Sequence, residues 1–298
     1  MASNQLIAAE TGHTPALRPA NAAVTPPPAS SNAAAVASPG GKAWRWAWQA
    51  GRRSAILVAF FALWEIAPRI GLVEPTFLPP LSQVLASGVQ LAASGQLFEH
   101  LGASLARSLT GFGISLLAAV PLGLAISWYK GAADTLNPLI ELLRNTAALA
   151  LLPVFILLLG IGESSKIALV VYSCSWPLLL NTIAGVRNVD PLLVKSARTM
   201  GVTPLQLFRK VILPAAVPTI FVGIRLAGAV SVLVLVAAEM IGAKAGLGYL
   251  VIYSQFNFQI PQMYFGILAI TAVGLVFNGV LLRLERHFSA WKRGGADR

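Results

Sequence analysis

The sequence contains few charged residues, which make up only 11% of its 298 residues, whereas a soluble domain has about a quarter. Hydrophobic residues make up 56%, and the mean hydropathy is +0.71. This composition indicates an integral membrane protein. The net charge of +11 does not indicate binding to nucleic acid, because the basic residues form short clusters between apolar runs rather than one aqueous face.

Residues that serve chemistry are also scarce. Cys174 is the single cysteine, so an intramolecular disulfide is excluded and a cysteine-based metal site is disfavoured. The three histidines are His13, His100 and His287, and no His-Glu-x-x-His or Gly-x-Ser-x-Gly motif occurs. These absences argue against a membrane-embedded enzyme and against a metal or other cofactor. No Gly-x4-Gly-Lys-[Ser/Thr] motif occurs either, so the chain lacks a phosphate-binding P-loop.

Long apolar runs are abundant. A bilayer core requires about 20 apolar residues per helix, and six runs satisfy this length. We therefore expect an all-α, polytopic protein with six transmembrane helices, at about 54–73, 107–128 (with a kink at Pro121), 143–162, 165–186, 217–243 and 263–284.

The basic residues predict the orientation of these helices. Of the 22 Lys and Arg residues, 17 fall on one side, Arg225 lies within a span, and four fall on the other side, at Arg69, Arg107, Lys166 and Lys244. Because cytoplasmic loops are enriched in Lys and Arg, both termini are expected in the cytoplasm.

Composition divides the chain further. Residues 1–41 are rich in Ala, Pro, Ser and Thr and predict a disordered cytoplasmic tail. Residues 42–53 alternate Trp with cations, which is typical of an interfacial anchor. Residues 54–99 should hold the first transmembrane helix and a periplasmic connection, 100–286 the membrane core, and 287–298 a basic cytoplasmic tail.

The polar segment 190–214 separates two apolar runs and has strong helix signals. Asp190-Pro191 and Thr203-Pro204 are both typical helix starts, and Gly201 is a typical helix end. Ala197 lies four residues before Gly201, so the two should share one small-residue face. Such a helix either docks into a groove on another protein or packs on its own membrane domain, and the pattern leaves both possibilities open.

The same segment resembles a known family. Permeases of binding-protein-dependent ABC importers have a cytoplasmic signature of Glu-Ala-Ala, three residues, Gly, nine residues, Ile, one residue and Leu-Pro. This chain has the same spacing, with Lys and Ser in place of Glu and the first Ala, at Lys195-Ser196-Ala197, Gly201, Val211 and Leu213-Pro214. Residues 100–113, 142–162 and 235–251 are similar to the sulfonate, taurine and nitrate branch of these permeases.

The resemblance implies a type I importer fold in the bacterial inner membrane. It also implies two ABC ATPase subunits, a second permease copy, expected to form a homodimer, and a periplasmic or lipoprotein substrate-binding protein. Segment 190–214 would transmit ATPase motion, through Lys195, Ser196, Ala197, Arg198, Gly201, Leu213 and Pro214. The implied substrate is a small anion such as a sulfonate, taurine or nitrate.

Ionisable residues within apolar runs are costly and should face protein or water. Glu65, Arg225 and Glu239 are such residues, and Arg225 and Glu239 would be about 21 Å apart on one helix, too far to pair. Glu239 either lines or gates the path or holds the external loop, where Gly242, Gly246 and Gly248 predict a turn. Candidates for the translocation path, with helix packing as the alternative role, are Ser231, Glu239, Ser173 and Asn181.

Two other functions remain open. A stand-alone secondary transporter would favour an intramembrane ion relay, for which only a few scattered ionisable residues exist, and it would leave segment 190–214 unexplained. A membrane-embedded enzyme is the less favoured alternative, since the catalytic motifs above are absent.

Overall fold

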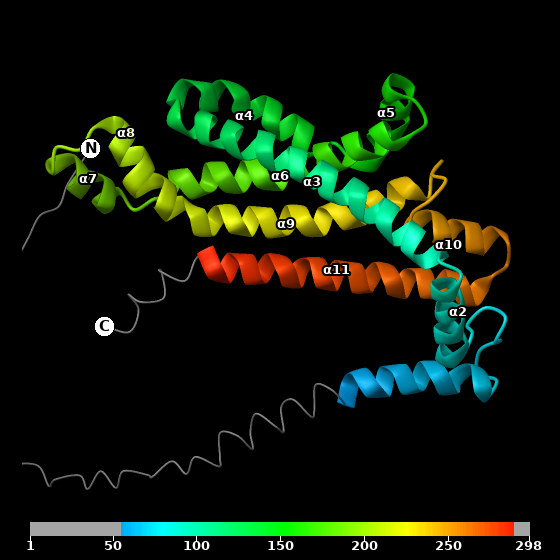
Figure 1. Ribbon diagram of the computed structural model, residues 1–298. Helices are drawn as coiled ribbons and strands as arrows, with labels where there is room; N and C mark the ends of the chain where they lie inside the picture. Colours follow the sequence, from blue (N-terminus) through cyan, green and yellow to red (C-terminus); the bar gives the residue numbers. More distant parts are fainter. Residues whose placement is uncertain (1–54, 289–298) are drawn as a thin grey trace, which may run out of the picture. The chain divides into compact units, whose positions relative to one another are not determined.

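The computed structural model describes residues 55–288, so the predicted tail at 1–41, the anchor at 42–53 and most of the tail at 287–298 lie outside them. The described part is helical throughout, with no strand (Figure 1). A first helix occupies residues 55–69. The others are α2 (Leu81–Ala93), α3 (Gln96–Trp128), α4 (Lys130–Arg144), a 3₁₀ turn (Ala148–Leu151), α5 (Leu152–Leu159), α6 (Glu163–Arg187), α7 (Pro191–Thr199), α8 (Pro204–Leu207), a π turn (Phe208–Ile212), α9 (Leu213–Glu239), α10 (Leu247–Phe256) and α11 (Ile260–Phe288).

Several of these helices can cross a membrane. Among the described residues, four helices are long and apolar enough, and a bent pair brings the number to five if it counts as one span. The four are Gln96–Trp128, Glu163–Arg187, Pro204–Glu239 and Ile260–His287. The prediction of an all-α, multi-span protein is therefore confirmed. The predicted run at 54–73 corresponds to the helix at 55–69, and six spans remain a prediction.

Two helices extend beyond the predicted spans. Helix α3 contains the span predicted at 107–128 but begins at Gln96, and Pro121 lies inside it. The fifth helix is continuous from Pro204 to Glu239 and begins 13 residues before position 217. A hydropathy window stops at Arg107, whereas the helix continues through this residue because Arg107 is paired with carboxylates.

The predicted third span, 143–162, was wrong as one helix. Residues 135–144 and 148–159 form two helices that bend by 87° across a short break. Polar side chains occur at this break: the Asn145 side-chain amide donates to the Glu141 carbonyl at 2.8 Å, and the Thr146 hydroxyl donates to the Leu142 carbonyl at 3.3 Å. These bonds satisfy carbonyls of the last turn of α4, which a continuous helix would have paired with backbone amides.

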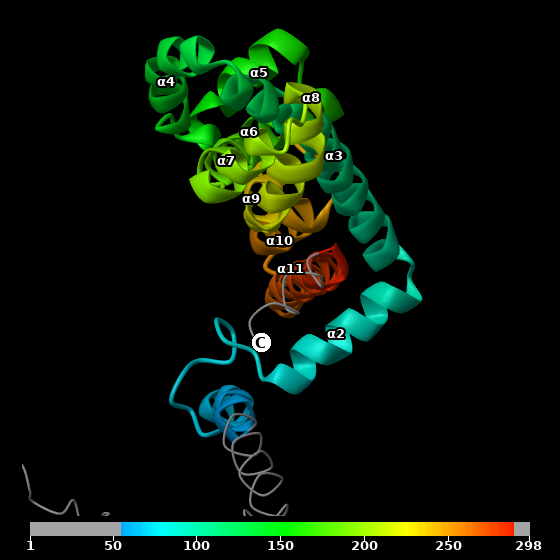
Figure 2. The ribbon, with the colours of Figure 1, turned by 90° about the vertical axis from the view of Figure 1, so that its left-hand side faces the viewer.

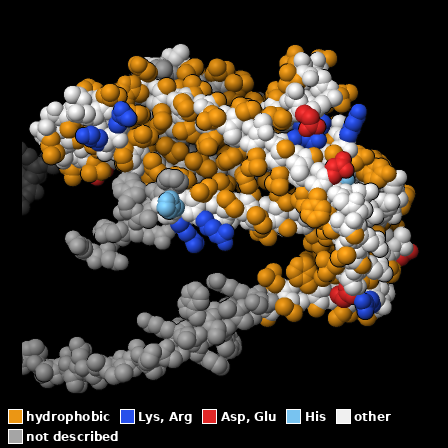
Figure 3. Space-filling model, viewed as in Figure 1, with side chains coloured by type: hydrophobic (Ala, Val, Ile, Leu, Met, Phe, Trp, Pro, Cys, Tyr) orange, Lys and Arg blue, Asp and Glu red, His pale blue; other side chains and the backbone are white. Residues whose placement is uncertain are grey.

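Helix α6 is the centre of the packing, in contact with both α3 and α9 (Figure 2). Small residues allow the close approach. A Cβ atom at Gly111 of α3 would lie 2.7 Å from Val170 of α6, and one at Gly223 of α9 would lie 2.6 Å from Asn181. Helix α11 packs on α9 and on α2. The outer surface is largely apolar, as the space-filling view shows (Figure 3).

Candidate functional site

Segment 190–214 folds as two helices around a glycine turn. Asp190 accepts a hydrogen bond from the Leu192 amide at 2.8 Å and caps α7. Gly201 has a φ of 73°, the left-handed conformation that glycine adopts cheaply, and its amide donates to the Arg198 carbonyl. Thr203 and Gln206 form a reciprocal capping box at the start of α8. The predicted helix, turn and second helix are confirmed.

This segment lies at one end of the membrane helices, beyond the start of α9 (Figure 1). Lys195, Ser196 and Arg198 are exposed, and Leu213 and Pro214 are half-buried in the first turn of α9. Apolar side chains on its surface are exposed as well, at Leu192, Leu193 and Met200. An exposed apolar surface on such a short, well-capped segment is typical of an interaction site.

The expected small-residue face is only half correct. No atom lies within 4 Å of a Cβ atom built at Gly201, so the surface there is open. Ala197, by contrast, is only 8% exposed and is buried by its own chain. Helix α7 packs on α8 and on the π turn, so Ala197 lies against its own segment and its contact with a partner stays a prediction.

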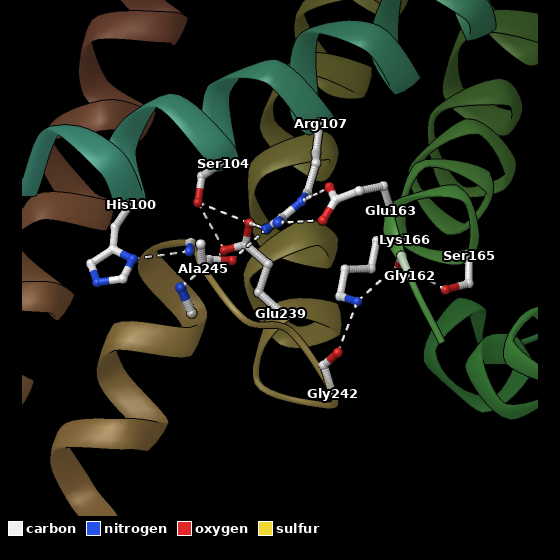
Figure 4. A network of polar contacts seen from close by, with 12 residues as sticks. His100, Ser104, Arg107, Gly162, Glu163, Ser165, Lys166, Glu239, Gly242 and Ala245 are labelled. Atoms are coloured by element: carbon white, nitrogen blue, oxygen red, sulfur yellow. Dashed lines mark hydrogen bonds and ion pairs between the residues drawn. The ribbon is translucent and has the colours of Figure 1, made fainter. Parts of the chain in front are cut away.

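A buried ionic network lies at the other end of α9, about 40 Å away by the rise of the helix. We use this name for Ser104, Arg107, Glu163, Lys166 and Glu239 (Figure 4). The side chain of Glu239 is fully buried and that of Arg107 is 5% exposed. Glu163, at the edge of the network, is 63% exposed. Buried ions are stable only when they are paired or hydrogen-bonded, and Glu239 and Arg107 pair with each other while Lys166 donates to backbone carbonyls.

Arg107 of α3 is the central donor. Its Nη1 donates to Glu239 Oε1 and to the Ala245 carbonyl, both at 2.6 Å. Its Nη2 donates to Glu163 Oε1 at 2.7 Å, and its Nε donates to the second oxygen of the same carboxylate. Arg107 thus forms a two-bond fork with Glu163 at the start of α6, while its remaining donor reaches α9 and the loop after it.

Glu239, the last residue of α9, caps the next helix. Its carboxylate accepts from the Gly248 amide at 3.0 Å and from the Ser104 hydroxyl at 2.8 Å and 2.9 Å. Ser104 Oγ in turn accepts from the Leu247 amide at 2.8 Å. The first amides of α10 are therefore satisfied, and an anionic group lies at a helix N-terminus, where the helix dipole favours it.

Lys166 completes the charge balance. Its Nζ donates to the Gly162 carbonyl at 3.0 Å and to the Gly242 carbonyl at 3.2 Å. The network thus contains two cations and two carboxylates, and its five side chains join α3, α6 and α9 to the loop of residues 240–246. Gly242 and Gly246 of this loop have positive φ values, so the predicted glycine turn is present, whereas Gly248 lies inside α10.

The other residues predicted to line the path are hydrogen-bonded within their own helices. Ser173 donates to the Leu169 carbonyl, and Asn181 donates to the Pro177 carbonyl, both at 2.8 Å. Ser231 donates to the Gly228 carbonyl at 2.8 Å and lies 3.1 Å from the Ser108 hydroxyl of α3. Arg225 pairs with Glu285 of α11 at 3.2 Å and, as expected, not with Glu239.

The network partners of Glu239 were not found from the sequence. Arg107 and Lys166 were treated only as external charges, and Ser104 and Glu163 were not selected. The available signal was that Arg107, Glu163 and Lys166 occur at the starts of apolar runs beside an unpaired intramembrane Glu239. Among the described residues no cluster of His, Cys, Asp or Glu could hold a metal ion.

Several apolar spans, a capped segment at one end and a buried ionic network at the other are the features of a polytopic membrane protein. The family described as "Binding-protein-dependent transport system inner membrane component" matches residues 101–294, and the chain belongs to it. It is a non-catalytic permease subunit of an ABC importer, located in the inner membrane, and the permeases of this family work with an ATPase and a substrate-binding protein.

Three curated relatives are similar over most of their length. The putative aliphatic sulfonates transport permease protein SsuC of Bacillus subtilis is 33% identical over 88% of this chain and 94% of its own. SsuC of Escherichia coli is 36% identical over 78% and 89% of the two chains. The taurine transport system permease protein TauC of Escherichia coli is 32% identical over 83% and 93%.

Solved structures show the same fold. A chain of the inward-facing MetNI methionine ABC transporter matches with a TM-score of 0.56 and 17% identity, over 66% of this chain and 98% of its own. A chain of an amino acid ABC transporter matches with a TM-score of 0.54 and 19% identity, over 68% and 96%. Both confirm the expected type I importer permease fold.

Proposed function

We propose that this permease forms the membrane path for a small organic anion with a sulfonate group, such as an alkanesulfonate or taurine. The main support for this proposal comes from three relatives that are named for sulfonates or taurine. Each is more than 30% identical to this chain and is covered over at least 89% of its own length. A relative named for formylaminopyrimidine transport is 27% identical and supports a competing substrate class.

The substrate is tested with the whole importer. The chain is reconstituted into vesicles with its ATPase and binding protein, and ATP-driven accumulation of labelled taurine and butanesulfonate is measured beside a formylaminopyrimidine. Accumulation of a sulfonate with ATP, and not without it, is the expected result. Accumulation of the pyrimidine alone would refute the proposed substrate class.

A groove beside the bent span is our candidate for this chain's share of the path. It has a volume of about 740 Å³ and is lined from α3, α4, α5 and α6, by Thr110, Ile114, Leu143, Phe155, Ser164, Ile167, Ala168, Val171, Tyr172, Ser175 and Trp176. The Tyr172 hydroxyl donates to the Leu143 carbonyl at 2.6 Å, next to the break. Broken backbone at membrane depth is tolerated where it lines a cavity.

The lining of this groove suits weak, transient binding of an anion that is being transported. It contains hydroxyl groups and aromatic rings but no Lys, Arg, Asp or Glu. The hydroxyls of Tyr172 and Ser175 already donate to backbone carbonyls, so those of Thr110 and Ser164 are left to offer weak hydrogen bonds to sulfonate oxygens. A fixed cation in a dry site would hold the anion strongly. We assign a helix-packing role to Ser173, Asn181 and Ser231, and a loop-holding role to Glu239.

Segment 190–214 is proposed to dock on the ATPase, through Lys195, Ser196, Ala197, Gly201, Leu213 and Pro214, whereas Arg198, expected in the same set, lines a cavity between the segment and the membrane helices. Its rigid caps and its exposed Leu192 and Met200 support this role, while the buried Ala197 would act by supporting the fold of the segment. A cysteine at Met200 should crosslink to the ATPase in the assembled importer. Crosslinking only to this chain's own spans would indicate that the segment packs on its own membrane domain instead.

We further propose that two copies of this chain form the membrane unit. In the four spanning helices, 11–39% of each apolar window is buried within the chain, so large apolar faces remain for lipid and for another subunit. Two differently tagged copies should co-purify in the ATPase-bound complex at equal amounts. Recovery of one tagged copy together with a different permease would establish a heterodimer.

A further inference from the structure

A cavity with two unpaired arginines lies where segment 190–214 meets the membrane helices. Its volume is about 880 Å³, and its lining comes from the ends of α3 and α6 and from both halves of the segment, as Ser127, Trp128, Val186, Arg187, Arg198, Val202, Pro204, Leu207 and Ile212. No acidic residue is in this lining. Within residues 55–288, neither Arg187 nor Arg198 forms an ion pair, and Asp190 nearby in sequence caps α7 instead.

A second, apolar groove adjoins the cavity. It has a volume of about 420 Å³ and is lined by Leu124, Ala125, Trp128, Tyr129, Pro204, Leu205 and Phe208. The two spaces share Trp128 and Pro204 in their linings, so they lie side by side. The rings of Trp128 and Phe208 meet edge to face with centroids 5.0 Å apart, and Leu205 is 65% exposed along this groove.

The combination has the shape of a lipid site. Guanidinium groups bind phosphate through forked hydrogen bonds, and Trp at the end of a span marks the headgroup level. Basic pockets between membrane helices on the cytoplasmic side are suited to anionic headgroups. The Ser127 hydroxyl already donates to the Gly123 carbonyl at 2.7 Å, so the two arginines are the principal donors to a phosphate in the cavity.

We infer that this junction binds one anionic phospholipid, with its phosphate between Arg187 and Arg198 and an acyl chain along the apolar groove. A free phosphate would use the cavity but would leave the adjoining groove empty. An acidic side chain of a protein partner would likewise leave Leu124, Leu205 and Phe208 uncovered. A phospholipid would occupy both spaces, with its headgroup in the cavity and an acyl chain in the groove, and would fill the junction between segment 190–214 and the spans.

The test uses the intact assembly with its ATPase, purified in detergent and titrated with phosphatidylglycerol in native mass spectrometry. Arg187→Gln and Arg198→Gln should each weaken phosphatidylglycerol binding about fivefold, the factor typical of one basic residue near an anionic surface. The matched control is Arg209→Gln, because Arg209 is an exposed cation of the same segment that lines neither space. It should bind phosphatidylglycerol as the unmodified protein does.

A second pair of variants tests the acyl chain. Leu205→Ser should weaken phosphatidylglycerol binding, whereas Leu142→Ser should not, since Leu142 is 67% exposed but lines neither the cavity nor the groove. Phosphatidylcholine should bind more weakly than phosphatidylglycerol, and glycerol 3-phosphate should not compete at equal concentration.

Three results would overturn the inference. One is unchanged phosphatidylglycerol binding in both arginine variants. Another is full competition by glycerol 3-phosphate, which would make the cavity a site for a soluble anion. The third is phospholipid binding only when the ATPase has been removed, which would assign the cavity to the partner protein. None of these measurements depends on which solute the importer transports.

Discussion

At the scale of single residues, the side chain with the most consequences is Glu239. It is fully buried and accepts hydrogen bonds from Ser104, Arg107 and the Gly248 amide. Two cations and two carboxylates compensate one another in the buried ionic network, so removing the Glu239 carboxylate leaves one excess positive charge there and takes from Arg107 its buried partner, while the exposed Glu163 still pairs with it. Loss of one partner from a buried ion pair costs about 3–5 kcal/mol, whereas loss from an exposed pair costs about 0–1 kcal/mol.

Glu239→Gln is therefore expected to lower the stability of the permease by about 3 kcal/mol or more. Glu141→Gln provides the matched control, because Glu141 is exposed and its pair with Arg144 is long, at 3.5 Å. That control should change stability by less than about 1 kcal/mol. Denaturant-induced unfolding of the two variants in detergent measures the difference, and equal stabilities would show that the network contributes little.

Gly246 is the second critical residue, because two separate constraints act on it. Its φ is 129°, and a Cβ atom there would collide with the Glu239 carboxylate. Gly160 is a control that separates backbone strain from the collision with a side chain. Its φ is 82°, but nothing lies within 4 Å of its Cβ position. Gly160→Ala should cost about 1–2 kcal/mol from backbone strain alone. Gly246→Ala should cost more in the same unfolding assay, and equal costs would mean that the network relaxes freely.

At the scale of helices and turns, much of segment 190–214 could be predicted from sequence because its signals are local. Asp190, Gly201 and Thr203 each act within three residues of their own position, so the caps and the turn were found without knowledge of the fold. The burial of Ala197 was not predictable, because it depends on how α7 lies against the rest of the chain. The network was missed for a similar reason: Arg107 is 56 residues from Glu163 and 132 from Glu239.

Gly201 connects the local turn to the action of the segment. A β-branched residue at this positive φ would strain the backbone. Its side chain would not collide with a neighbour, because nothing lies within 4 Å of the Cβ position. Gly201→Val should therefore distort the turn without preventing membrane insertion. In reconstituted vesicles, uptake per ATP hydrolysed should fall by about fivefold or more, as expected for strain of 1–2 kcal/mol.

The control for this change is Gly95→Val. Gly95 has a similar φ of 80° and equally open surroundings, but it precedes α3, far from the segment in sequence. Normal uptake per ATP in Gly95→Val together with a loss in Gly201→Val would place the defect in coupling. A similar loss in both variants would show only that left-handed glycines are needed for the fold.

At the scale of the whole molecule, the two functional regions are separated by the length of α9. Segment 190–214 precedes this helix and Glu239 ends it, so any movement of the segment is transmitted along a helix whose far end is fixed by the buried ionic network. Helix α6 follows the same course, from Glu163 in the network to Arg187 beside the segment. Because both helices pack closely through small residues, we expect them to tilt together rather than to slide past one another.

The arrangement requires the two regions to lie on opposite sides of the membrane. Lys195 of the segment and Lys244 of the loop after α9 are both exposed, whereas the single native cysteine, Cys174, is fully buried. Lys195→Cys and Lys244→Cys therefore provide single reporters in the native background. In intact cells, a membrane-impermeant maleimide should label Lys244→Cys and leave Lys195→Cys unlabelled until the membrane is opened. The reverse pattern would invert the orientation predicted from the Lys and Arg distribution, and with it the assignment of segment 190–214 to the ATPase.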